Sequence, residues 1–240
     1  MVLSFSVMDL AQAEQIELPG GTARIEWRRS PRARRVSLRI DPSVGAVVVT
    51  LPMRAARSAG VSLLMDNAAW VSERLARLPD AVPLAPGFEI EIGGVPHVIR
   101  HVPNVRGGVW IEGVCLCVSG EAAFIRRRVT DFLRREARRR LAALVAEKAS
   151  LLGASVRRVT VRDTRSRWGS CASDGSLSFS WRLIMAPPFV QDYVAAHEVA
   201  HLRHMNHGKR FWALVAKLTP HKDAAMAWLH SEGSRLLRVG

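Results

Sequence analysis

One short segment of the chain has residue types and spacing suited to chemistry, and it contains His197, Glu198 and His201. On a helix, two histidines four residues apart lie on one face and can bind a single ion. Glu198 lies about 100° further round such a helix, beside the ion rather than on it. A general base that activates water at a zinc ion belongs in that position. The segment therefore predicts a zinc site with Glu198 as its catalytic residue.

A third ligand is expected, because catalytic zinc usually has three protein ligands and one open position. His204 stays on the same face of an unbroken helix, but it lies about 10 Å along the axis from His197. His207 precedes Gly208, where the helix is expected to end and the chain can turn back. Its ten-residue offset is that of the metzincin pattern, although His204 stands where that pattern has glycine. The spacing favours His207 and leaves His204 and the more distant Glu232 as alternatives.

An accidental cluster of histidines at a helix end is the competing interpretation. Six of the eight histidines lie between residues 197 and 230, which raises the chance of a fortuitous match. However, Tyr193, Val194 and Val199 place this helix in a core, and burying histidines and a glutamate without partners costs free energy. We therefore expect one Zn²⁺ per chain.

The elements that must position this site begin with a small β-rich domain. Alternating apolar residues around turn residues indicate strands, and apolar residues at helical spacing indicate a helix. They predict, in chain order, a hairpin over 36–51, a helix over 61–75, a hairpin over 88–102 and a strand over 114–118. We assign residues 1–20 to a weakly ordered lead-in and residues 21–120 to the β-rich domain.

From Glu121 onwards the pattern becomes largely helical. It predicts a long amphipathic helix from Ile125 to Gly153, strands over 156–161 and 177–181, and helices from Phe189, over 209–218 and over 223–237. The histidine segment falls on the helix that starts near Phe189, after the Pro187-Pro188 pair. We assign residues 121–240 to a second domain, and the whole chain to the α+β class.

The composition excludes several protein classes. Three cysteines in 240 residues cannot form a disulfide framework, and we expect Cys115, Cys117 and Cys171 to be packing residues. The first twenty residues carry acids and no base, which is the wrong polarity for a signal peptide. No uncharged apolar run approaches the roughly 18 residues that a membrane span needs. We expect a cytoplasmic protein with no membrane partner.

Arginines dominate the charge, with 31 of them against four lysines and a formal net charge of +14. They form two clusters, seven within Arg24–Arg39 and eight within Arg126–Arg140. Such clusters can bind phosphates, so a nucleic acid is a candidate partner. A solvated helix face is the favoured interpretation, because no stacking aromatics are interleaved with the arginines. A nucleic-acid-binding module with a structural zinc is therefore the alternative function, although a structural site has no need of Glu198.

Several motifs carry a family resemblance. They are Arg167-Trp168-Gly169-Ser170-Cys171, Trp181-Arg182-Leu183-Ile184 with Pro187, Asp192 to Leu202, Asn206-His207 and Phe211-Trp212. Together they resemble the YgjP-like metallopeptidase family, which is similar to the SprT-like zinc proteases of the zincin type. The resemblance extends over roughly residues 25–235, and Val199-Ala200 departs from the Leu-Cys that the family often has there.

The resemblance implies a zincin-like metallopeptidase domain over 121–240. It implies zinc on His197, His201 and His207, with Glu198 catalytic, and a hydrolase acting on peptide bonds. It also suggests that Ser176–Arg182 is the edge strand that holds an extended or unfolded polypeptide substrate by backbone pairing. Candidates for stabilising the oxyanion are Tyr193, Arg165 and Arg167. A protease recruited to DNA-bound proteins by its arginines combines the two functions.

Overall fold

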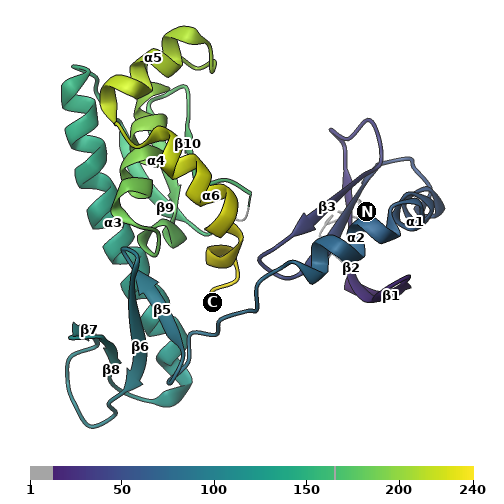
Figure 1. Cartoon of the computed structure of the whole chain (residues 1–240), viewed down its shortest axis with the longest axis horizontal. Coiled ribbons are helices and arrows are strands. Elements are labelled where there is room, and N and C mark those ends of the chain that lie inside the picture. The colour runs from purple at the N-terminus through teal and green to yellow at the C-terminus, as the bar shows by residue number, and fades with distance from the viewer. Residues whose placement is uncertain (1–12, 165) are drawn as a thin grey trace, which may run out of the picture. The chain divides into compact units, whose positions relative to one another are not determined.

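The computed structural model describes residues 13–164 and 166–240, and it has the α+β fold that the sequence predicts (Figure 1). The chain divides into two compact units, one ending at Leu78 and the other beginning at Pro79. This division differs from the predicted domain boundary between residues 120 and 121. No helix of the described residues is both long enough and apolar enough to cross a membrane.

The first unit is a four-stranded sheet with two helices. Its strands are β1 (Ala13–Leu18), β2 (Gly21–Ser30), β3 (Ser37–Asp41) and β4 (Ala46–Pro52), in the order β1-β2-β4-β3. Strands β2 and β4 are parallel, whereas the other two pairs are antiparallel. The predicted hairpin over 36–51 is confirmed as β3 and β4.

Two predictions for this unit are wrong in detail. The helix expected over 61–75 is two helices, α1 (Arg57–Asp66) and α2 (Ala68–Ala76), because the backbone of Asn67 leaves the helical region at ψ 16°. Residues 13–18 of the expected lead-in form strand β1, while residues 1–12 lie outside the described residues. Gly20 and Gly21, with φ of 116° and 126°, make the turn into β2.

The second unit begins with another four-stranded sheet. Its strands are β5 (Glu89–Ile92), β6 (Val95–His101), β7 (Val109–Glu112) and β8 (Cys115–Val118), in the order β5-β6-β8-β7. Buried Ile99 and Leu116 of this sheet share one core with Val129 and Leu133 of helix α3 (Ile125–Leu151), which follows the short turn η1 (Ala122–Phe124). Residues 79–120 therefore belong with the second half of the chain, because α3 covers their apolar face.

A three-stranded sheet and three helices complete this unit. The strands are β9 (Arg158–Arg162), β10 (Gly169–Cys171) and β11 (Ser176–Ser180), in the order β10-β11-β9. The helices are α4 (Pro188–Ala200), α5 (Lys209–Leu218) and α6 (Lys222–Leu237), and the turn η2 (Trp181–Ile184) precedes α4. Figure 1 shows the β5–β8 sheet at the N-terminal end of α3, with α4 beside the remainder of that helix.

The position of β11 corrects one expectation. Ser176–Arg182 was expected to contain an edge strand, but β11 pairs with β10 on one side and with β9 on the other. Its side chains Leu177 and Phe179 are fully buried, so its alternating pattern reflects a central strand. The two edges of this sheet are β10 and β9.

Candidate metal centre

The metal centre is built on α4 and on the turn that follows it. Pro188 occupies the first turn of α4, where its fixed φ favours a helix and its missing N–H costs nothing. After Ala200 the amides of Arg203 and His204 both donate to the Ala200 carbonyl, which closes the helix. The Arg203 guanidinium then donates to the carbonyls of Leu152 (3.0 Å) and Gly153 at the end of α3. This anchored turn lets the chain reverse toward the helix.

The reversal brings His197, His201 and His207 together. Their ligand nitrogens all lie within 4.8 Å of one another, and the Nε2 atoms of His197 and His207 are 3.0 Å apart. The two alternative third ligands make other contacts. The backbone carbonyl of His204 accepts from His201, and the Glu232 carboxylate forms an ion pair with Arg235 at 3.3 Å. The structure therefore assembles the three histidines that the spacing favours.

The donor set fits a zinc ion. His201 Nδ1 lies 3.0 Å from the His204 carbonyl, so this nitrogen must carry the proton and Nε2 keeps a free lone pair. Two nitrogens on a tetrahedral zinc ion lie about 3.3 Å apart, close to the observed His197–His207 separation. Burial, followed by the charges of His201 and His207, lowers the pKa of His197 to about 4. His197 is therefore neutral at neutral pH, as a metal ligand must be.

Aromatic side chains of α5 line the histidines. The fully buried Phe211 ring has its centroid 5.0, 4.6 and 4.7 Å from the rings of His197, His201 and His207. The Trp212 ring lies 5.7 Å from that of His207. This apolar lining fixes the imidazole planes and excludes water from one side of the site.

Glu198 lies beside the histidines and is 5% exposed. Burial raises the pKa of Glu198 to about 7, and the charge of Arg167 opposes that rise. Strand β10 passes against this carboxylate: a Cβ atom added to Gly169 would lie 2.5 Å from Glu198 Oε1 and 2.6 Å from its Cγ. Gly169 belongs to the motif Arg167-Trp168-Gly169-Ser170-Cys171, but the sequence alone assigned it no role at the site. A glycine inside a short strand is the signal for such a close approach.

The remaining candidate residues near the site differ in how deeply their side chains are buried. Tyr193 is buried with its ring 5.9 Å from that of His197, whereas Arg167 is exposed. Arg165 lies outside the described residues. Cys171 is half-buried on β10, and burial, with the charge of Glu198, raises the pKa of its thiol. A protonated thiol in this place fits a packing role.

Comparison with protein families decides the identity of the chain. The model of the YgjP-like metallopeptidase domain matches residues 34–232. The chain belongs to the YgjP-like metallopeptidase family. Membership implies a metal ion and a polypeptide substrate, and the matched range extends across both compact units.

Two other comparisons complete the picture of this YgjP-like chain. Among solved structures, it is similar to the crystal structure of the metallopeptidase zymogen abylysin of Pyrococcus abyssi, at 20% identity and a TM-score of 0.33. That similarity covers 38% of the present chain and 95% of the abylysin chain. Comparison with curated proteins gives no match.

A buried ion pair connects the helix of the YgjP-like metal centre to its neighbours. Lys148 of α3, with 7% of its side chain exposed, lies 2.6 Å from the Asp192 carboxylate on α4. The Thr219 hydroxyl, at the end of α5, donates to the other oxygen of Asp192. These contacts join α4, which carries His197 and is capped by His201, to α3 and to the end of α5.

Proposed function

We propose that this metallopeptidase is zinc-dependent, with one ion held by His197, His201 and His207 and with Glu198 as the general base. The observation that carries the proposal is the convergence of three imidazole nitrogens within 4.8 Å of one another beside a buried carboxylate. Three histidines with an adjacent open position are the ligand set of a catalytic zinc. A purely structural zinc site would have no use for Glu198.

Each residue then has a defined task. A bound zinc ion supplies Lewis-acid polarisation of the scissile carbonyl and lowers the pKa of water. The Glu198 carboxylate accepts the proton of the attacking water and afterwards delivers it to the leaving amine. The His204 carbonyl holds the Nδ1 proton of His201, which orients that imidazole. Gly169 leaves the space that the Glu198 carboxylate occupies.

The edge of β10 is the place where we propose that substrate binds. The Ser180 amide donates to the Trp168 carbonyl at 2.8 Å, and the Ala172 amide to the Ser176 carbonyl at 2.9 Å. Because antiparallel pairing alternates, the backbone groups of Gly169 and Cys171 between them point away from β11. An extended polypeptide that pairs with these groups passes directly beside Glu198. This arrangement supports an extended or unfolded polypeptide as the substrate.

Metal analysis of histidine variants tests the ligand assignment. His197→Ala, His201→Ala and His207→Ala should each lose zinc, whereas the neighbouring His204→Ala should keep it, because only its backbone carbonyl contacts the site. Elemental analysis of the four purified proteins measures the outcome. Zinc lost from His204→Ala and retained in His207→Ala would reverse the assignment.

The general base is tested separately. Glu198→Gln should retain zinc and fold, yet hydrolyse an unfolded test protein about 10²–10⁴ times more slowly, because general-base catalysis typically contributes that factor. Stopped assays on wild type and variant, with metal content measured on the same samples, give the comparison. Hydrolysis by Glu198→Gln at the wild-type rate contradicts the mechanism.

A further inference from the structure

A groove in the second unit lies between α3 and β9, apart from the metal centre. Its volume is about 510 Å³, and its lining residues are Arg134, Arg135, Arg138, Arg158, Val159, Thr160 and Val161. Three of the arginines come from α3 and the fourth from β9. No described residue of the metal centre lines this groove.

The lining of this groove shows that it runs along the edge of a strand. Successive side chains of a strand point to opposite faces of the sheet. A single cavity can therefore be lined by the four consecutive residues Arg158 to Val161 only along their backbone edge. Among the described residues β9 pairs with β11 alone, so this edge is open.

The hydrogen-bond pattern identifies the backbone groups on that edge. The Ser176 carbonyl accepts a hydrogen bond from the Ala172 amide on the β10 side, so the next residue, Leu177, turns its backbone groups toward β9. In the parallel register Leu177 lies opposite Val159 and therefore bonds to Arg158 and Thr160. The N–H and C=O groups of Val159 and Val161 consequently point away from β11. The groove thus presents both donors and acceptors to an incoming chain.

The charge of the groove is strongly positive. Arg135, Arg138 and Arg158 are exposed, while Arg134 lies 3.9 Å from the Asp163 carboxylate. No acidic side chain is among the described residues that line the cavity. Arginine guanidinium groups bind carboxylates in paired, charge-assisted hydrogen bonds. The occupant must therefore bring negative charge as well as backbone donors and acceptors.

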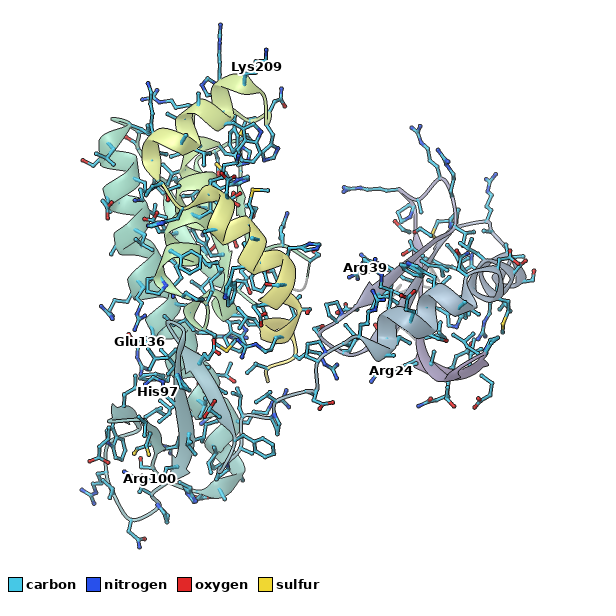
Figure 2. The ribbon with its side chains drawn as sticks, in the orientation of Figure 1. Arg24, Arg39, His97, Arg100, Glu136 and Lys209 are labelled. Atoms are coloured by element: carbon cyan, nitrogen blue, oxygen red, sulfur yellow. The ribbon has the colours of Figure 1, made fainter. Side chains whose placement is uncertain are left out.

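We propose that this groove binds an acidic segment of an extended polypeptide, which adds to β9 as a further strand and sets its carboxylates against the arginines. A polypeptide satisfies both kinds of edge group, whereas a nucleic-acid backbone offers phosphate acceptors. The groove also lacks aromatic side chains on which bases stack, among the residues that line it. The structure thus divides the arginine clusters: Arg24 and Arg39 lie in the first unit (Figure 2), and this groove uses part of the α3 cluster only.

The inference deepens the proposed function, since the bound segment would belong to the polypeptide substrate. The three-stranded sheet then has two polypeptide edges, β10 at Glu198 for the scissile segment and β9 for an acidic segment elsewhere in the substrate. Binding at β9 needs neither metal nor hydrolysis. It can therefore be tested on the inactive Glu198→Gln protein, so that failure of the groove and failure of the zinc mechanism are distinguishable.

Charge matching is tested with two triple variants made in that background. Arg135→Gln, Arg138→Gln and Arg158→Gln together remove the groove charges. Arg126→Gln, Arg127→Gln and Arg139→Gln remove equal charge from α3 outside the groove. Fluorescence anisotropy with a labelled peptide of alternating Glu and Val should show affinity falling about tenfold in the groove variant, and less than twofold in the control.

Backbone pairing is tested at Val159 without any change of charge. Val159→Pro removes an outward N–H, and proline is tolerated on a strand edge where that N–H does not bond within the sheet. Val159→Ala shortens the same side chain but keeps the N–H. The acidic peptide should bind more weakly to Val159→Pro and unchanged to Val159→Ala, with circular dichroism checking the fold of both.

Three results would overturn the inference: no binding of the acidic peptide, equal weakening in both triple variants, or tighter groove-dependent binding of an oligothymidylate with the same charge. In the last case the groove would be a nucleic-acid site.

In the active enzyme, the groove variant should raise KM for a substrate that carries an acidic tract and leave kcat unchanged. A substrate without that tract should be hydrolysed equally by groove variant and wild type.

Discussion

The two four-stranded sheets of this chain have the same topology but belong to different units. In each sheet two antiparallel hairpins are joined by a parallel pairing of their second strands, in the orders β1-β2-β4-β3 and β5-β6-β8-β7. The first sheet forms a separate core, whereas the second is part of the core that carries the metal centre. The difference shows that strand order alone does not determine which unit a sheet joins.

The helices that follow the sheets account for the difference. After β4 the helical segment is interrupted at Asn67, and Leu64, Ala68 and Val71 of its two short helices close a core with the strands. After β8 the helix α3 runs for 27 residues, with buried side chains from Ile125 to Ala149. Because it is that long, α3 packs on the sheet at one end and on α4 further along.

The largest effect is expected from breaking the link between α3 and α4. Lys148→Met leaves the half-buried Asp192 carboxylate with the Thr219 hydroxyl but without its cationic partner, and breaking a buried ion pair typically costs about 3–5 kcal/mol. Denaturant titration should show this loss in the second unit only. On the same helix Arg139→Met removes an exposed pair with Glu136 at 3.0 Å, and should cost about 0.5 kcal/mol or less. Equal losses in the two variants would refute the role of the buried pair.

A cavity in the core of the first unit should destabilise that unit and leave the metal centre unchanged. Leu64 is fully buried between α1 and the sheet, so Leu64→Ala should destabilise the first unit by about 2–5 kcal/mol. Metal content and peptide hydrolysis should be unchanged under native conditions, since the metal centre lies in the other core. Met65→Ala, at an exposed neighbour, is the control. Loss of metal from Leu64→Ala would show that the cores are coupled.

A change at the metal centre should separate activity from stability. Gly169→Ala places a methyl group 2.5 Å from Glu198 Oε1 and must displace the carboxylate. Misplacement of a catalytic group by about 1 Å can cost about 10² in rate, so we expect a hundredfold lower kcat with zinc retained. The adjacent Ser170→Ala adds no atom near Glu198 and should remain active. A Gly169→Ala enzyme of normal kcat would mean that β10 can move away freely.

The smallest effect is expected at the interruption between α1 and α2. Asn67→Ala removes the hydrogen bond from the side-chain amide to the Leu63 carbonyl, at 2.8 Å, but introduces a better helix former. These contributions are of similar size, so the free energy of unfolding should change by about 0.5 kcal/mol or less. Thermal and denaturant unfolding measure it. A stabilisation well above that value would indicate that Asn67 alone keeps the two helices apart.

Local information in the sequence was sufficient for most elements and for two histidines of the site. Periodicity placed the helix of His197 and His201, the long helix from Ile125 and both hairpins, because helix and strand periods depend on neighbouring residues only. The i, i+4 spacing put two imidazoles on one face of α4 before any packing was known. Family membership, which the motifs around this segment indicated, is confirmed over residues 34–232.

Tertiary structure decided what depends on pairing between distant segments. The reversal that brings His207 to His197 requires Arg203 to reach the end of α3, some fifty residues earlier. The approach of Gly169 to Glu198 and the central place of β11 follow from strand pairings that no local period encodes. Residues 79–120 belong to the second unit because α3 covers their apolar face. The sequence of a strand shows that its apolar face must be covered, but it does not show which helix covers it. Apolar burial is non-directional, so only the assembled core selects the partner.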